Sequence, residues 1–125
     1  MKYAIEKYDN FVVIEPMSEV LKGEEAIQLK VEFLLRNNTG HKNIVLDLQH
    51  VRRIDESGVR MGVLANRLCK AVGGVFILIE VCDEIFEFLR MCRIEKSFII
   101  RNDVEQAKRF IYHKDGGNHN RGAFL

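Results

Sequence analysis

Two short runs of almost continuous apolar residues constrain the fold of this chain more than any other feature of its sequence. They are IVLDL within residues 43–51 and VFILI at residues 75–79. Strands that are apolar on both sides are typical of parallel sheets, because the crossover connections place helices on both faces of the sheet. We therefore expect two buried parallel strands here, the first of them in the centre of the sheet.

Helical periodicity occupies much of the remaining chain. Apolar residues recur at three- and four-residue spacing in residues 24–36, 59–72, 83–92 and 103–112. In the first of these stretches the apolar positions predict one buried face, made of Ala26, Ile27, Leu29, Val31, Leu34 and Leu35. The polar and glycine residues at 37–40, and the pair Gly73-Gly74, are typical helix endings.

The remaining patterns predict a hairpin at the start of the chain and a short strand near its end. Residues 2–7 and 11–15 are rich in β-forming residues and are separated by Asp9-Asn10, which favour a tight turn. Residues 96–100 form the last expected strand. Because strands and helices alternate after the hairpin, we predict an α/β fold with a mixed, mostly parallel sheet and about four α-helices.

The length and composition fit one globular domain. With 125 residues, 47% of them hydrophobic, the chain is long enough to bury a core of its own. We assign residues 1–112 to this domain. Residues 113–125 are rich in Gly and Asn and have no periodicity, so we expect them to form a flexible tail.

Charge and cysteine content narrow the range of partners and compartments. Nineteen basic and eighteen acidic residues are interspersed, so no nucleic-acid partner is expected. No apolar run approaches the roughly 20 residues that cross a bilayer, so we expect no direct membrane insertion. Cys69, Cys82 and Cys92 lie in apolar stretches without a paired spacing, which indicates small core residues in a reduced, cytoplasmic protein. The sequence leaves open whether the chain forms a weak homodimer.

The sequence offers little support for a metal centre or an enzyme. The four histidines are not spaced like ligands with one another or with the cysteines, so we expect no metal and no cofactor. Ser57 lies in D-E-S-G-V rather than in G-x-S-x-G, and the two acidic residues before it would oppose an oxyanion. A small enzyme that uses Ser57 or a cysteine is therefore the least favoured hypothesis.

The stretch RRIDESGVRMG, residues 52–62, leads into the start of a predicted helix. At a helix start, free backbone N–H groups and the helix dipole stabilise a negative group by about 0.3 to 1 kcal/mol. Two interpretations stay open at this point. Either Ser57 accepts a phosphate that the helix stabilises, or Asp55 or Ser57 caps the helix while Glu56 complements its dipole.

The order of these parts resembles the core of a STAS domain, the fold of bacterial anti-sigma-factor antagonists. The parts are a strand of type I-V-L-D-L, the turn I-D-x-S-G, a helix, two glycines and a second buried strand, and a weaker likeness extends from the hairpin to Ile111. The resemblance implies a STAS-like fold and a regulatory protein that binds an anti-sigma factor, itself a serine kinase. It also implies that phosphorylation at the helix start breaks this complex.

The turn departs from the family pattern D-S-S/T-G at the residue that usually accepts the phosphate. Asp55 corresponds to the aspartate, Glu56 to the acceptor serine, Ser57 to the following Ser or Thr, and Gly58 to the glycine. The resemblance therefore implies that Glu56 supplies a fixed negative charge in place of a removable phosphate. Ser57 stays a second candidate for phosphorylation.

Two further residues change the expected docking surface. Lys22 stands where the family often has an acidic residue, and we expect it to form an ion pair with Glu56. Arg60 stands where a small or apolar residue is common. Our first hypothesis is a module that docks through residues 55–60 and helix 59–72 onto a kinase-type anti-sigma factor. The alternative is a constitutive STAS-like subunit of a transport ATPase or a stress-sensing complex.

Overall fold

A five-stranded sheet forms the middle of the computed structural model, which describes the backbone of residues 2–123 and the side chains of residues 2–114. In order across the sheet, the strands are β1 (Tyr3–Lys7), β2 (Val12–Pro16), β4 (Ile44–Asp47), β6 (Phe76–Ile79) and β7 (Ile99–Arg101). β1 runs antiparallel to β2, and the other neighbouring strands are parallel. The predicted mixed sheet with its N-terminal hairpin is confirmed.

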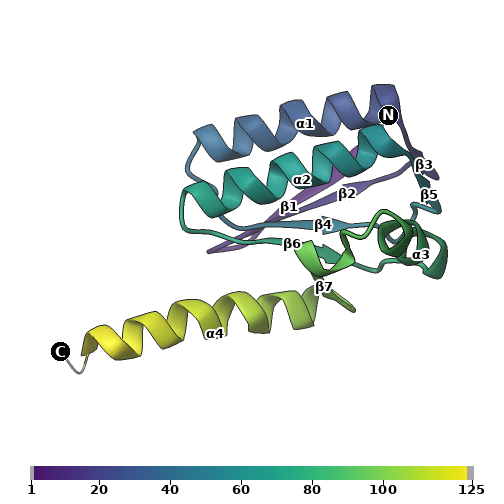
Figure 1. The fold of residues 1–125 in the computed structure, drawn as a ribbon. Coiled ribbons are helices and arrows are strands. Elements are labelled where there is room, and N and C mark those ends of the chain that lie inside the picture. The colour runs from purple at the N-terminus through teal and green to yellow at the C-terminus, as the bar shows by residue number, and fades with distance from the viewer. Residues whose placement is uncertain (1, 124–125) are drawn as a thin grey trace.

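Helices cover both faces of this sheet (Figure 1). Over the described residues they are α1 (Gly23–Asn38), α2 (Glu56–Ala71), α3 (Asp83–Met91) and α4 (Val104–Ala123). α1 and α2 lie side by side on one face, whereas α4 lies against the other. The predicted α/β fold with four helices is therefore confirmed. None of these helices combines the length and the apolar character that a bilayer span requires.

Successive residues of the central strands point to opposite faces, and both faces are buried. Ile44 and Leu46 belong to the core beneath α1, α2 and α3, whereas Val45 belongs to the core beneath α4. In β6, Phe76 and Ile77 divide between the two cores in the same way. This two-sided burial explains why the two strands are almost continuously apolar.

A second, two-stranded parallel sheet joins the loop before α1 to the loop before α2. It pairs β3 (Val20–Leu21) with β5 (Arg53–Ile54), and the Arg53 N–H donates to the Glu19 carbonyl at 3.0 Å. The N–H of Asp55 also donates to the Leu21 carbonyl at 3.1 Å. The sequence did not predict these strands. They hold the first turns of α1 and α2 at the same end of the molecule (Figure 1).

The buried face of α1 is narrower than the sequence predicts. Ala26, Leu29 and Phe33 are buried, but Ile27, Val31, Leu34 and Leu35 are 63%, 52%, 37% and 54% exposed. A helix that rests on a sheet directs a single stripe of side chains at it, and residues 26, 29 and 33 form that stripe. The prediction of one buried face was therefore wrong for these four residues.

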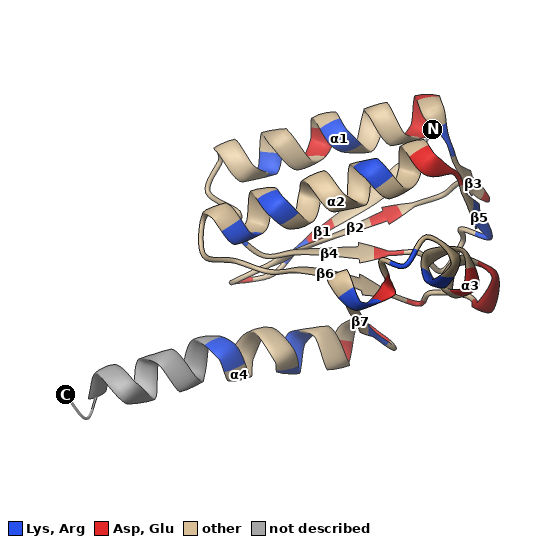
Figure 2. Ribbon diagram, in the orientation of Figure 1, with Lys and Arg blue, Asp and Glu red and all other residues tan. Residues whose placement is uncertain are grey.

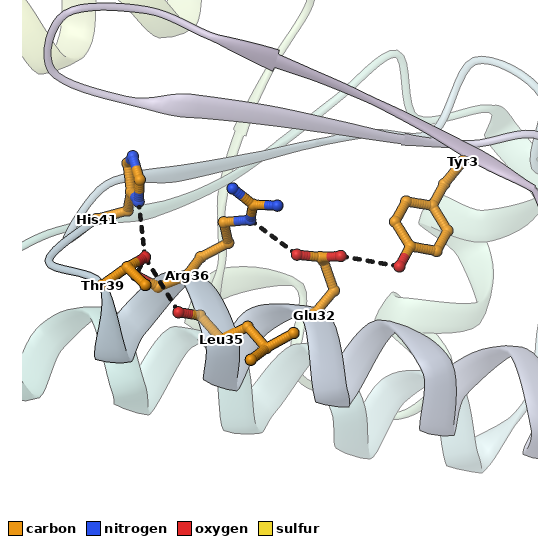
Figure 3. Close-up of polar contacts among 6 residues, drawn as sticks. All are labelled: Tyr3, Glu32, Leu35, Arg36, Thr39 and His41. Atoms are coloured by element: carbon orange, nitrogen blue, oxygen red, sulfur yellow. Dashed lines mark hydrogen bonds and ion pairs between the residues drawn. The ribbon is translucent and has the colours of Figure 1, made fainter.

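A buried carboxylate fastens α1 to the hairpin (Figure 3). Glu32 is 6% exposed, and its two oxygens accept hydrogen bonds from the Tyr3 hydroxyl at 2.8 Å and from Arg36 Nε at 2.7 Å. Because both oxygens are paired, the lost solvation of this charge is compensated. The hydrogen bond to Glu32 is also the main reason why the pKa of Tyr3 is raised.

The three cysteines occupy different environments. Cys69 is fully buried, and burial raises the pKa of its thiol to about 11. Cys82 is half-buried, and Cys92 is exposed where α3 ends. The prediction of small core residues is therefore right for Cys69 and wrong for Cys92, because Cys92 follows a helix that buries only Ile85 and Leu89.

The last helix is longer than the sequence predicts. α4 continues to Ala123, whereas the apolar pattern ends at residue 112. Gly and Asn are weak helix formers rather than obligatory stops, and extending a helix costs far less than starting one. The predicted helix end was therefore wrong. Flexibility of residues 113–125 stays a prediction.

Candidate functional site

The first turn of α2 contains the residues that the sequence singles out. The helix begins at Glu56 rather than at residue 59, and Asp55 is its N-cap, with an extended backbone. The Asp55 carboxylate accepts a hydrogen bond from the Gly58 N–H at 3.0 Å, which satisfies one of the free N–H groups of the helix start. Of the two capping residues left open by the sequence, Asp55 rather than Ser57 is therefore the cap.

Close packing explains the glycine at position 58. A Cβ atom there would lie 2.4 Å from Ile54 Cγ1 and 2.9 Å from the Leu21 carbonyl oxygen, both in the β3–β5 sheet. The backbone of α2 thus approaches this sheet more closely than a side chain would allow. Gly58 therefore sets the distance between α2 and the loop before α1.

Glu56 is the first residue of α2, and its side chain is 80% exposed. A carboxylate at this position complements the positive end of the helix dipole. One of its oxygens accepts a hydrogen bond from Arg60, one helical turn further on, at 3.2 Å. Such an exposed pair contributes less than about 1 kcal/mol, so Glu56 is readily available to a partner.

Lys22 directly follows β3, whose partner strand β5 leads into the turn, but Lys22 does not pair with Glu56. It is the exposed N-cap residue of α1, and its side chain makes no capping hydrogen bond. Within residues 2–114, the ion pair of Glu56 is formed with Arg60 and not with Lys22. Side chains four residues apart on a helix meet readily, which favours the pair within α2. The predicted Lys22–Glu56 ion pair was therefore wrong.

Ser57 is half-buried and lines an open groove between α1 and α2. The groove has a volume of about 440 Å³ and is lined by Gly23, Ala26, Ile27 and Lys30 of α1 and by Ser57, Arg60, Met61 and Leu64 of α2. Apart from Ser57 and Arg60, these residues were not among the sequence-predicted site residues. The apolar pattern of α1 singles out Ile27, but it predicts this residue as part of the buried face rather than as a site residue.

Charge is divided along the two helices. Figure 2 shows acidic residues at the first turns of α1 and α2 and basic residues further along α2. The acidic residues are Glu24, Glu25 and Glu56, and the basic residues of α2 are Arg60, Arg67 and Lys70. The site therefore has a negative end beside Glu56 and a positive middle.

The residues of the turn offer contacts that suit binding. Among residues 2–114, no three His, Cys, Asp or Glu side chains converge as metal ligands would. His50, the histidine nearest in sequence to the turn, instead contacts Glu15 through Nε2 at 2.8 Å. What the turn presents is an exposed carboxylate next to a partly apolar groove, an arrangement that suits a protein partner. The absence of a metal or cofactor stays a prediction.

Residues 2–107 match the STAS domain family. The chain is also 26% identical over 107 residues to BtrV, a candidate anti-sigma factor antagonist of Bordetella bronchiseptica. That alignment covers 86% of this chain and 91% of BtrV. Both matches agree with the family that the sequence motifs resemble.

Solved structures share the fold. A candidate anti-sigma factor antagonist of Thermotoga maritima has a TM-score of 0.77 at 21% identity, covering 87% of this chain and 93% of that one. The anti-sigma factor antagonist SpoIIAA in its unphosphorylated form has a TM-score of 0.74 at 18% identity, covering 87% and 96%. Phosphorylated SpoIIAA of Bacillus has a TM-score of 0.68 at 18% identity, covering 87% and 99%. By its match over residues 2–107 and by its fold, this chain belongs to the STAS domain family.

Proposed function

We propose that this protein is a regulatory binding module that docks on a kinase-type anti-sigma factor through residues 55–60 and the adjoining face of α2. Membership of the STAS family and the likeness to anti-sigma factor antagonists support a partner-switching role. The observation that carries the proposal is the position of Glu56, which is exposed at the start of α2 beside the groove lined by Ser57. A partner that rests on this turn contacts the carboxylate.

Glu56 stands where the family pattern puts the serine that is phosphorylated. A carboxylate carries one negative charge, whereas phosphoserine carries about 1.5 to 2 and has three acceptor oxygens. Glu56 thus imitates phosphoserine incompletely, with less charge and fewer acceptor oxygens, so we expect docking to persist, and no phosphatase removes its charge. We expect the partner to present a cation or a hydrogen-bond donor at this contact, and we expect ATP to leave the complex intact.

Ser57 is a poorer target for a kinase than a serine at position 56. Its side chain is half-buried in the groove, whereas the side chain at position 56 projects into solvent. A phosphate on Ser57 would also place a double charge against the apolar Met61 and Ile27, which would oppose docking. Ser57 therefore stays a second candidate for regulation.

The fixed charge of Glu56 also favours one alternative. A constitutive subunit of a transport ATPase or a stress-sensing complex makes a contact that is never released, so it needs no removable charge. This alternative predicts a native complex that contains no anti-sigma factor and survives both ATP and phosphatase. Co-purification from native lysate distinguishes it from the first proposal.

The decisive experiment measures binding to the anti-sigma factor kinase of the same genome, with and without ATP, for the natural chain and three variants. We expect the natural chain to bind, to stay bound with ATP and to gain no phosphate by mass spectrometry. Glu56→Ser should bind, become phosphorylated and dissociate when ATP is added. Glu56→Ala and Glu56→Gln, which offer no hydroxyl, should bind without ATP-dependent release.

Two results would contradict this proposal. If neither the natural chain nor any variant binds the kinase, docking on such a partner is wrong. If the natural chain is phosphorylated on Ser57 and released, the chain is a switch whose acceptor has moved by one residue, and the role of Glu56 as a fixed charge is wrong.

A further inference from the structure

The outer surface of α1 carries more apolar side chains than a solvated helix face needs. Ile27, Val31, Leu34 and Leu35 are 63%, 52%, 37% and 54% exposed. Their positions differ by three, four, seven and eight residues, so they lie along one side of the helix. Single exposed apolar residues are ordinary, but a row of this kind marks a second packing surface on a helix that already packs through Leu29.

This row borders the groove that begins at Ser57. Ile27 and Lys30 line the groove from α1, and Leu34 follows at the same helical spacing. Beyond the groove, toward the C-terminal ends of the two helices, the side-chain amide of Asn37 donates to the Leu68 carbonyl at 3.2 Å and keeps the two helices adjacent. The lining of the groove runs from Gly23 to Lys30 of α1 and from Ser57 to Leu64 of α2. At 1.5 Å per residue this is a length of about 10 Å, room for about two turns of a partner helix.

The charges beyond the first turns of α1 and α2 have one sign. Lys30 and Arg60 are exposed and line the groove, and the exposed Arg67 follows Leu64 by three residues on the same side of α2, whereas Glu32 of α1 is buried and paired. The charged residues that line the groove are Lys30 and Arg60, so a second copy of this chain laid groove to groove would bring like charges together, which disfavours self-association through the groove. The surface calls for a partner with acidic residues beside an apolar stripe.

We propose that the groove between α1 and α2 receives an acidic amphipathic α-helix of the protein partner. Its apolar side packs on Ile27, Leu34 and Leu64, and its acidic residues lie beside the groove's basic residues. Laying an amphipathic helix into an apolar groove is a recurrent mode of recognition. An anionic membrane fits less well, because the groove is concave and Glu56 lies at one end. The inference rests on the proposed function, since it extends the same docking surface.

The test uses the full-length protein, labelled with ¹⁵N, and two synthetic helical peptides with the same leucine pattern. The flanking positions are Glu in one peptide and Lys in the other. We expect the acidic peptide to shift the amide signals of residues 27–35 and 60–68 and to bind at least about fivefold more tightly than the basic peptide. Equal binding of the two peptides, or no shifts up to about 1 mM peptide, would overturn the inference.

Two sets of variants locate the binding. The double variant Lys30→Glu with Arg67→Glu should weaken binding of the acidic peptide about fivefold or more. The matched control, Lys108→Glu with Arg109→Glu, makes the same charge change on exposed residues of α4 and should leave the affinity unchanged. An equal loss in both double variants would show a general charge effect and overturn the inference.

The apolar part of the groove is tested with Ile27→Ser. Because Ile27 is 63% exposed, this variant should keep the unfolding temperature of the natural chain while losing at least about threefold in affinity for the acidic peptide. Unchanged affinity of this variant for the acidic peptide would overturn the inference. Binding of the natural chain to phosphatidylserine vesicles in place of the peptide would overturn it as well. The peptide assay contains no anti-sigma factor. If the protein binds the kinase but not the acidic peptide, this inference is wrong and the proposed function still stands.

Discussion

The carboxylate of Asp55 accepts a hydrogen bond from the Gly58 N–H at 3.0 Å. Gly58 in turn packs against the β3–β5 sheet so closely that a side chain would not fit. Together these contacts fix the first turn of α2 relative to the start of α1. The aspartate and the glycine of the turn thus have structural roles that need no phosphate. This explains how the turn keeps its shape with a glutamate, Glu56, between the cap and Ser57.

Removal of the Asp55 cap should destabilise the fold. Asp55→Ala leaves the Gly58 N–H without its acceptor, so the free energy of unfolding should fall by about 0.5 to 2 kcal/mol in urea titrations. Asp55→Asn and Asp55→Ser keep an acceptor oxygen and should lose much less. Glu56→Ala is the matched control, because an exposed pair four residues apart contributes less than about 0.5 kcal/mol. Equal losses for Asp55→Ala and Asp55→Asn would contradict the capping role.

Gly58→Ala should be destabilising for a steric reason. The added Cβ would lie 2.4 Å from Ile54 Cγ1 and 2.9 Å from a backbone oxygen, so α2 must shift, at a cost of about 1 to 3 kcal/mol. Gly23→Ala is the control, because a Cβ there meets no atom within 4 Å. That variant should be neutral or stabilised by up to about 1 kcal/mol in the same urea titration. Equal changes in the free energy of unfolding for Gly58→Ala and Gly23→Ala would contradict the close approach at Gly58.

The longer helices and strands of this fold could be predicted from the sequence, whereas the shortest strands could not. β4 and β6 have enough apolar residues to show burial on both faces. β3 and β5 have two residues each and no period to detect. They form because loops distant in sequence exchange backbone hydrogen bonds, such as that from Arg53 to Glu19. Nothing in either loop sequence specifies this pairing.

The candidate site, like the fold, could be predicted only in part from the sequence. The D-x-S-G pattern located the helix start, because the cap and the close packing depend on residues near one another in sequence. The side of α1 that faces the sheet could not be chosen, since the apolar residues of α1 fill two adjacent stripes and the sequence does not show which one the sheet covers. The groove beside Ser57 needs both helices in place, so no local pattern could reveal it.

The hydrogen bond between Tyr3 and Glu32 should make stability depend on pH above about 10. The folded state raises the pKa of Tyr3 above its ordinary value of 10.0, chiefly through that hydrogen bond, so it favours the neutral hydroxyl. The stabilisation is complete below the unfolded pKa and is lost as the pH rises through the folded one. The natural chain should therefore lose stability more steeply than Tyr3→Phe in alkaline urea titrations.

The Tyr3→Phe variant also has a defined effect at neutral pH. It leaves one oxygen of the buried Glu32 carboxylate without its partner, so unfolding should be easier by about 1 to 3 kcal/mol at pH 7. Tyr112→Phe is the matched control, because Tyr112 is 69% exposed and its replacement should leave the stability at neutral pH unchanged. Parallel pH profiles for the natural chain and Tyr3→Phe would contradict the assignment.

The three thiols should react with a maleimide in the order Cys92, Cys82 and Cys69. Cys92 is exposed, whereas Cys69 is fully buried with a pKa raised to about 11, so at pH 8 very little of it is the reactive thiolate. Cys92→Ser should remove the fastest step seen by mass spectrometry, and Cys69 should be labelled only when urea unfolds the chain. Rapid labelling of Cys69 in the folded protein would mean that α2 separates readily from the sheet, because Cys69 lies in the core between them.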